Sequence, residues 1–462
     1  MFINYIIIYI LFLLHLTFEE KIIIPFKIIQ KVSPEYFLSL DDYFTYWHEL
    51  SFYSELLIGT PEQKILTKLT FDDYGISILN KGCDYDSYLM NINNALNIKD
   101  TSSSFIKTND IYDDESFNYK KFYDAFYARD NIYFNNKIKS NLKFIYSPND
   151  NQQISTCLNF GFMAYTRNLR ENNLNIIMQL KKSNVINNYD WSILFNEGVF
   201  LLGTTPHEYK PELYNENNLY GSAYYYDDLI AYFNLQVNKI YFHSNKKSDE
   251  DIHISDSNIL YLIPTKGLIK GTPDYEYKIE KDFFNDFIFQ NKCFKDFTNN
   301  NKYRTFTCIN NPSVKEELRT KFPKLYFEHK NFLYTFELNF DDLFKSKGDK
   351  IYFLVFFETS VNPYWEMGLP FMKKYVFNYN YDNKIISFYN NNFKETNEKN
   401  KNSNIKIGNI ILILIFSILV CVLGFILGKK IRKKKRLTAE ELELNFSLGS
   451  QENNNMESFN NK

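Results

Sequence analysis

The sequence predicts a mainly β fold, and three observations support that prediction. Short segments rich in Tyr, Phe, Ile and Leu recur along the chain between clusters of Asn, Asp and Gly, which is the pattern of strands and turns. Apolar residues make up 45% and aromatic residues 18% of the chain, so a substantial core is possible. The helix candidates, 172–183 and 279–290, are few beside the strand candidates.

The chain begins with an apolar segment, which predicts a signal peptide over residues 1–18. This segment is short for a membrane span and is followed by Glu19 and Glu20. A basic leading region and a small-residue cleavage site are both absent, so a signal anchor is the alternative.

Residues 19–396 are expected to form the exported part of the protein. The strand candidates here share a high content of Tyr, Phe, Ile and Leu. Examples are Ser51–Ile58, Asn131–Phe134, Val199–Leu202, Leu235–Phe242 and Lys384–Tyr389.

The C-terminal part predicts a membrane anchor. A polar linker at 397–406 leads into 407–428, which carries no charged residue and is long enough to cross a bilayer. The basic run 429–436 follows at once, and such a run marks the cytoplasmic side. We therefore expect a single-pass type I protein of the secretory pathway or plasma membrane. Its ectodomain would be luminal or extracellular, and residues 429–462 would form a cytoplasmic tail.

Charge and histidine spacing exclude some functions. The formal net charge is −2, with no general basic field, so a nucleic-acid partner is not expected. The exported histidines are scattered without metal-ligand spacing, so no metal and no cofactor are predicted.

The cysteines predict disulfides. Cys83, Cys157, Cys293 and Cys308 lie in the exported part, whereas Cys421 lies in the predicted span. An oxidising compartment favours pairing. Cys293 with Cys308 is the expected local pair, which leaves Cys83 with Cys157.

Two motifs carry a resemblance to a known family. The segment Phe52–Gln63 contains IGTPEQ, and Trp365–Phe371 reads WEMGLPF. Asp100–Phe105, Gly198–Gly203 and the closing segment to Phe388 lie between and after them in a matching order. Together they resemble pepsin-like aspartic proteases (peptidase A1).

The resemblance implies a bilobal pepsin-like aspartic protease fold, here with a C-terminal transmembrane helix. The N-terminal β lobe would span residues 19–225 and the C-terminal β lobe residues 226–396. Each lobe would supply one carboxylate loop, and an extended peptide would lie in the cleft between the lobes under a hairpin flap. The reaction would need two carboxylates that share one proton.

The first catalytic loop is degenerate. Without a gap, Thr70 occupies the position of the acid; with a two-residue insertion in the strand, Asp72 occupies it. In the second case Asp73 and Tyr74 replace the Thr or Ser and the Gly that the family uses.

The second loop and the flap are also altered. Asp256 and Ser257 match the family pattern, but Asn258 replaces its Gly. Tyr119 occupies the position of the flap tyrosine, and the flap glycines are missing. The alternative interpretations are polar turn residues for Asp72 and Asp256, and a packed strand residue for Tyr119.

We therefore expect a catalytically impaired pseudo-protease that binds an extended peptide or protein in the cleft. One alternative is an active, membrane-tethered aspartic endopeptidase that performs proteolysis with Asp72 and Asp256. A second alternative is a surface structural or adhesion protein.

Overall fold

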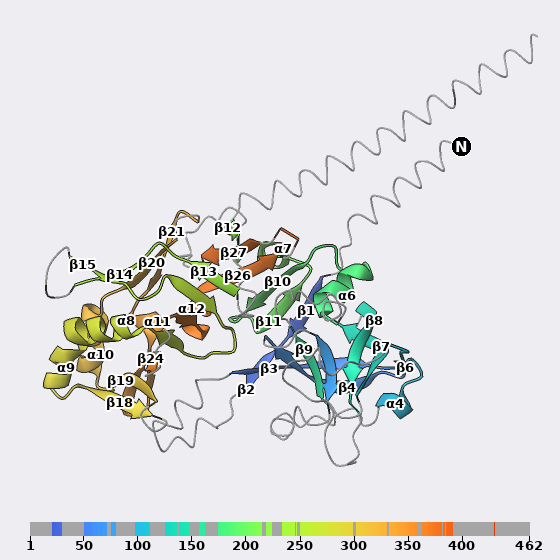
Figure 1. Ribbon diagram of the computed structural model, residues 1–462, viewed down its shortest axis with the longest axis horizontal. Coiled ribbons are helices and arrows are strands. Elements are labelled where there is room, and N and C mark those ends of the chain that lie inside the picture. Colours follow the sequence, from blue (N-terminus) through green and yellow to red (C-terminus); the bar gives the residue numbers. More distant parts are fainter. Residues whose placement is uncertain are drawn as a thin grey trace, which may run out of the picture. The chain divides into compact units, whose positions relative to one another are not determined.

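The computed structural model describes residues 21–29, 50–71, 75–79, 98–110, 125–135, 138–147, 157–161, 174–214, 219–223, 233–244, 246, 250–298, 302–329, 332–358, 363–380, 382–383, 385–390 and 429. These residues form a mainly β structure, which confirms the mainly β part of the predicted fold class (Figure 1). The strands of residues 21–390 belong to one compact unit.

Several predictions concern residues outside this set. The signal peptide at 1–18, the linker at 397–406, the span at 407–428 and almost all of the tail lie outside the described residues. Within the described part of the chain, none of the helices has the length and apolarity needed to cross a bilayer. The proposed lobe boundaries stay predictions.

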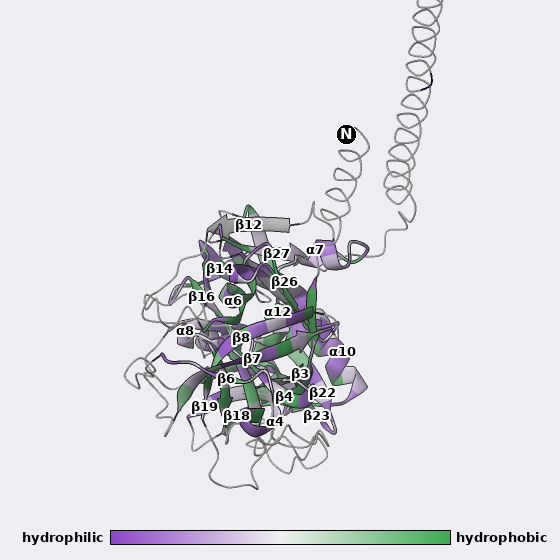
Figure 2. Ribbon diagram, turned by 90° about the vertical axis from the view of Figure 1, so that its right-hand side faces the viewer, coloured by the Kyte–Doolittle hydropathy of each residue, from purple (hydrophilic) through white to green (hydrophobic). Residues whose placement is uncertain are grey.

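An eight-stranded sheet comes from the first half of the chain, and its order is β2-β3-β4-β9-β5-β8-β7-β6 among the described strands. The predicted strand Ser51–Ile58 is β3, and Asn131–Phe134 is the end of β7. Buried positions alternate with more exposed ones along β8 from Ile138 to Phe144, as expected for a strand with one buried face. Figure 2 shows that hydrophilic and hydrophobic residues are mixed along the strands of the structure. The strands are β2 (Lys27–Ile29), β3 (Ser51–Ile58), β4 (Gln63–Thr70), β5 (Ile76–Leu79), β6 (Ile106–Lys107), β7 (Phe126–Phe134), β8 (Ile138–Tyr146) and β9 (Cys157–Gly161).

A six-stranded sheet combines strands from both halves of the chain, in the order β1-β11-β10-β26-β27-β12 among the described strands. The predicted strands Val199–Leu202 and Lys384–Tyr389 correspond to β11 and β27. The six are β1 (Ile22–Pro25), β10 (Asp190–Leu194), β11 (Val199–Leu202), β12 (Leu219–Ala223), β26 (Tyr375–Asn380) and β27 (Ile385–Asn390).

The second half of the chain supplies the other two sheets. In the described chain, a nine-stranded sheet has the order β13-β16-β25-β17-β24-β19-β23-β22, with β18 paired to β19, and a four-stranded sheet has the order β15-β14-β20-β21. The first contains β13 (Phe233–Gln236), β16 (Ile259–Leu262), β17 (Ile269–Gly271), β18 (Cys293–Thr298), β19 (Tyr303–Ile309), β22 (Phe344–Lys347), β23 (Lys350–Phe353), β24 (Val355–Glu358) and β25 (Trp365–Met367). The second contains β14 (Lys239–His243), β15 (Asp251–Ile254), β20 (Leu325–His329) and β21 (Tyr334–Leu338).

One predicted strand is divided in the structure. Leu235–Phe242 was expected to be continuous, but β13 ends at Gln236 and β14 begins at Lys239. The backbone N–H of Val237 bonds to Asn258, whereas that of Asn238 bonds to Glu328. The chain therefore passes from one sheet to another between these residues, and this depends on distant partners that the local pattern does not contain.

Short helices connect the strands. The predicted helix at 172–183 is α6, which starts at Ile176 because Asn175 caps it by accepting bonds from the N–H groups of Ile177 and Met178. The helix predicted at 279–290 begins earlier, at Pro273, because Thr272 caps it and proline suits its first turn. The helices are α4 (Ile98–Thr101), α6 (Ile176–Lys182), α7 (Pro206–Tyr209), α8 (Pro273–Ile279), η4 (Glu280–Phe284), α9 (Asn285–Phe289), α10 (Pro312–Lys321), α11 (Phe340–Leu343) and α12 (Leu369–Lys374).

The nine-stranded sheet has two chemically different faces. One face belongs to the main hydrophobic core, where Phe306, Cys308, Ile351 and Phe353 are buried. The residues between them along the strands face the other way. This second face carries aromatic, lysine and threonine side chains.

Candidate functional site

Asp256, the second predicted catalytic residue, lies in the connection between β15 and β16. Its side chain is exposed, and its Oδ2 accepts a hydrogen bond of 2.6 Å from the backbone N–H of Asp274 in the first turn of α8. Asp274 in turn accepts bonds from the N–H and Oγ of Ser255, at 2.7 and 3.0 Å. Asp256 therefore fastens its loop to the start of a helix.

Electrostatics stabilise the same contact. Burial opposes ionisation of Asp274, but hydrogen bonds from Lys278 and Ser255 outweigh it, and the pKa of Asp274 lies below its usual value. Lys278 Nζ lies 2.7 Å from Asp274 Oδ2, one helical turn along α8. The carboxylate of Asp274 stays ionised and holds the loop at neutral pH.

The other predicted site residues are not described. Asp72, Tyr119 and Cys83 lie outside the described residues, and only the backbone of Cys157, the first residue of β9, is described. The proposed pairing of Asp72 with Asp256 and the disulfide between Cys83 and Cys157 therefore stay predictions. Among the described residues, no group of three or more His, Cys, Asp and Glu side chains is placed to hold a metal ion.

The predicted disulfide between Cys293 and Cys308 is confirmed, with an S–S distance of 2.03 Å. It joins the β18–β19 hairpin, whose register places Cys293 opposite Cys308. On the same side, Arg304 forms two hydrogen bonds of 2.7 Å to the Glu276 carboxylate, and Lys295 lies 2.6 Å from Glu280. A covalent bond and buried or half-buried ion pairs thus hold this hairpin against α8 and η4.

The register of the sheet assembles a cluster of side chains that sequence reasoning missed. We call it the lysine–aromatic patch. Its first row runs across β18, β19, β23 and β22 through Phe294, Thr307, Tyr352 and Lys345. Its second row runs across β19, β23 and β22 through Ile309, Lys350 and Lys347. Residues opposite each other on paired strands project to the same face.

The exposure of these side chains differs along the rows. Phe294 and Ile309 keep 45% and 43% of their surface exposed, so this end of the rows offers apolar surface to solvent. Lys345 and Lys350 are exposed, whereas Thr307 is buried and donates to the Asp296 carboxylate. The sequence signal for the patch was the spacing Lys345-x-Lys347 with Lys350 after the turn, but the contribution of β18 and β19 depends on pairing.

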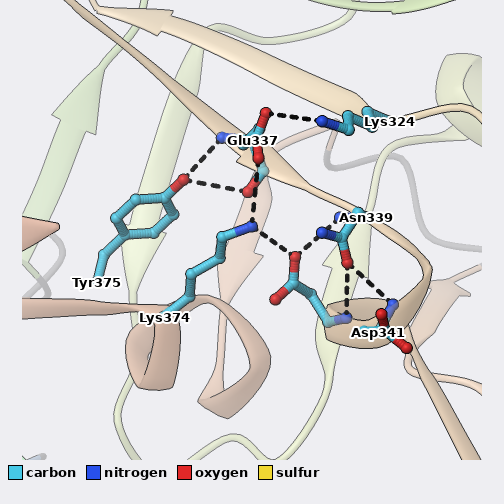
Figure 3. Close-up of polar contacts among 7 residues, drawn as sticks. Lys324, Glu337, Asn339, Asp341, Lys374 and Tyr375 are labelled. Atoms are coloured by element: carbon cyan, nitrogen blue, oxygen red, sulfur yellow. Dashed lines mark hydrogen bonds and ion pairs between the residues drawn. The ribbon is translucent and has the colours of Figure 1, made fainter. Parts of the chain in front are cut away.

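The two lysines of α12 near the patch have different environments. Lys374 lies between two carboxylates, 2.7 Å from Asp342 and 3.8 Å from Glu337, and Tyr375 bonds to the backbone of Glu337 (Figure 3). The residue Lys373 is exposed as a whole, but neighbouring atoms partly desolvate its ammonium group. This desolvation and the charge of Lys345 lower the pKa of Lys373. Lys374 therefore fixes α12 to α11 and β21, while Lys373 adds positive charge near Lys345.

A buried lysine occupies the centre of the same sheet face. Lys270 Nζ lies 3.1 Å from Glu366 and 3.5 Å from Glu358, and 3.9 Å from the centre of the Tyr364 ring. Burial disfavours its charge, but Glu366 and Glu358 outweigh that effect and raise the pKa of Lys270. Its partners satisfy it, so we interpret Lys270 as structural.

Residues from three separate segments of the chain meet at another buried polar cluster. The buried carboxylate of Asp130 accepts bonds from Ser102 and Ser104, at 3.1 and 2.6 Å. Ser102 Oγ also accepts the backbone N–H of Thr60 at 2.9 Å. This cluster holds the turn after β3, where Gly59 has φ +84° and a side chain would meet Ser102.

Comparisons with known proteins concern only the fold. No family model matches the chain, and no curated protein matches it. Among solved structures, conglutin gamma, a basic 7S globulin from lupine seeds, matches with a TM-score of 0.53. Its identity is 8%, and the match covers 80% of this chain and 95% of that chain. The two proteins share a fold.

The assignment to the pepsin-like aspartic protease family is wrong, since no family model supports it. The two motifs that suggested it satisfy local packing. Gly59 is needed in a tight turn, and a Cβ on Gly368 would lie 2.2 Å from the carbonyl oxygen of Leu268. Short motifs of this kind meet structural needs, so they do not identify a family by themselves.

Proposed function

We propose that this chain is an exported, membrane-tethered binding protein that captures an extended peptide segment of a partner protein along β18. The proposal retains the class of ligand expected from the sequence and assigns it to a strand edge. The observation that carries it is the disulfide-braced β18, which pairs only with β19 among the described strands. The disulfide supports export, since such bonds persist in oxidising compartments.

The backbone of β18 is suited to strand addition. The Cα atoms of Cys293 and Cys308 are 3.9 Å apart, which is typical of a pair that does not exchange backbone hydrogen bonds. The neighbouring bond from Ile309 N–H to the Lys292 carbonyl agrees with this phase. The N–H and C=O groups of Lys295 and Phe297 therefore point away from β19, where an added strand would bond to them.

The side chains beside this edge favour a peptide ligand. Phe294 and Phe297 are 45% and 52% exposed and project to opposite faces of β18. Each offers apolar surface to alternate residues of an added strand. Exposed edge strands usually carry charged side chains, above all lysines, that discourage pairing with another strand. The lysine of β18, Lys295, forms ion pairs with Glu276 and Glu280, so its charge does not protect the edge in this way.

The engagement of Asp256 supports binding rather than catalysis. Its carboxylate is used in the contact with α8, and the proposal gives it no part in bond cleavage. The membrane tether is inferred from the uncharged segment 407–428 and the basic run after it. In sealed vesicles, added protease should remove a tag at Lys462; a protected tag would refute this orientation.

The decisive experiment compares Phe297→Pro with Phe297→Ala in the full-length protein in nanodiscs of neutral lipid. The probe is a labelled neutral peptide that alternates Val and Thr. Proline removes the outward N–H without disturbing the bonds to β19, so binding should weaken at least about tenfold, while alanine should retain most of it. Hydrogen exchange should slow at the amides of Lys295 and Phe297 when wild type binds the peptide.

Two results would overturn the proposal. One is equal binding by wild type and Phe297→Pro, provided that both variants retain the disulfide and melt like wild type. The other is a peptide that binds without protecting β18, which would place the ligand elsewhere. Absence of any peptide binding would favour the structural or adhesion role.

A further inference from the structure

The lysine–aromatic patch combines basic charge at one end with exposed apolar surface at the other. We propose that this patch is a second interaction surface, which binds an acidic segment of a protein partner lying across β19, β23 and β22. It uses side chains on one face of the sheet, whereas the proposed function depends on the backbone edge of β18. Phe294 contributes to both sites, but the lysines belong only to the patch and Phe297 only to the edge. The two sites can therefore be tested separately.

Positive charge is concentrated at the β22–β23 end. The paired strands place three lysines at neighbouring positions: Lys345, Lys347 and Lys350. Lys373 lies near them, since the charge of Lys345 lowers its pKa. Among the described residues, neither Lys345 nor Lys350 forms an ion pair. Like charges held this close repel each other, and a ligand with carboxylates would relieve that repulsion.

The acidic groups nearby do not cancel this charge. Asp296 lies on the same face of β18 and accepts the hydroxyl hydrogen of Thr307, which leaves its negative charge in place. Asp349 lies in the turn between β22 and β23 and is the acidic residue of that turn. The three lysines of the hairpin, together with Lys373, outnumber the carboxylates of Asp296 and Asp349, so the local charge is positive.

The apolar end selects a peptide over other anions. Phe294 and Ile309 are diagonal neighbours on β18 and β19, and both are nearly half exposed. A sulfated glycan or a phosphate group has no apolar part to cover them. A peptide can place an apolar side chain on Phe294 and Ile309 and carboxylates on the lysines.

The sheet geometry gives the spacing that such a peptide needs. Phe294 and Lys345 stand three strand positions apart in the first row, and neighbouring strands are about 4.8 Å apart, so the row spans roughly 14 Å. An extended peptide rises about 3.3 Å per residue, which places the carboxylates about four residues from the apolar anchor. Closer or more distant spacing should bind less well.

The patch is held rigidly by contacts on the opposite face. The Cys293–Cys308 bond and the Arg304–Glu276 pair join its strands to each other and to α8, on the core side. Substitutions on the patch leave these contacts intact. The ligand therefore meets a preorganised surface, which reduces the entropy lost on binding.

The test uses full-length protein in nanodiscs of neutral lipid and a labelled peptide with one Phe and a pair of glutamates at the predicted spacing. The double variant Lys345→Glu/Lys350→Glu should weaken its binding at least about tenfold, since it replaces attraction by repulsion. The matched control is Lys107→Glu/Lys139→Glu, which changes two exposed lysines of the eight-stranded sheet by the same charge and should bind like wild type. Phe294→Ala should also weaken binding.

Other probes decide the nature of the ligand and the independence of the site. A peptide with glutamines in place of the glutamates should not compete, and added salt should weaken binding of the acidic peptide. Phe297→Pro should leave this binding unchanged. Equal binding by the double variant and its control would overturn the proposal, as would stronger binding of heparin or of anionic lipid vesicles than of the acidic peptide.

Discussion

His329, the last residue of β20, is a buried histidine in the described chain. Its side chain is 4% exposed and stacks on Phe332, with the ring centres 4.0 Å apart. Its Nδ1 accepts the backbone N–H of Phe332 at 3.1 Å, so the ring is neutral at that nitrogen. Burial lowers the pKa of His329 from 6.5 to about 4, although its own backbone partly opposes the shift.

This shift predicts a pH dependence of stability. Between pH 6.5 and about 4 the unfolded chain binds a proton at His329 that the folded protein does not. The neutral His329 therefore contributes fully to the free energy of unfolding above pH 6.5. This contribution, up to about 3 kcal/mol, is lost as the pH falls toward 4. Urea denaturation of wild type and His329→Gln across this range measures it. Parallel pH profiles for the two proteins would contradict the prediction.

At the scale of elements, the β18–β19 hairpin depends on contacts at both of its ends. The disulfide closes a loop with a sequence separation of 15, and Arg304 connects β19 to α8 through Glu276. Cys293 and Cys308 are buried, so the bond also fills part of the core. The ion pairs alone are weaker because their side chains are partly open to solvent.

Removal of the disulfide should destabilise the protein measurably. For a loop of this size the chain-entropy argument gives about 3 kcal/mol. The variant Cys293→Ala/Cys308→Ala should therefore unfold at lower urea concentration than wild type, and reductant should lower the wild-type midpoint toward that of the variant. Mass spectrometry that finds both thiols free in the native protein would remove the basis of this prediction.

At the scale of the whole molecule, the six-stranded sheet unites the two halves of the chain. β10 pairs with β11 on one side and with β26 on the other, and β26 pairs with β27. Trp191 stacks on Tyr379 across this junction, with ring centres 4.0 Å apart. The closing strands are therefore part of the core that the N-terminal half needs.

Truncation tests this dependence. A chain that ends at Asn392 retains the whole compact unit and should unfold cooperatively. A chain that ends at Lys374 lacks β26 and β27, so the edge of β10 becomes exposed. The core also loses the buried side chains of Tyr375, Phe377 and Phe388. It should aggregate or lack a cooperative melt, as followed by calorimetry. A normal melt for the shorter chain would show that β26 and β27 are not needed for cooperative folding.

The amino-acid sequence by itself determined those features that depend on near neighbours. It predicted the mainly β class, the strands Ser51–Ile58 and Val199–Leu202, and the local disulfide between Cys293 and Cys308. Alternation, turn residues and short loop closure are encoded within a few residues or one hairpin. The family assignment was wrong because short glycine motifs report packing needs and not descent.

Long-range pairing determined the rest. The division of the predicted strand 235–242 and the two rows of the lysine–aromatic patch follow from which strands pair and in which register. The role of Asp256 depends on the start of α8, which lies 18 residues further along the chain. A shift of one residue in that register would turn Lys345 and Lys350 toward the core. No single segment specifies such a register, because it is set by the burial of apolar residues from distant segments at the same time.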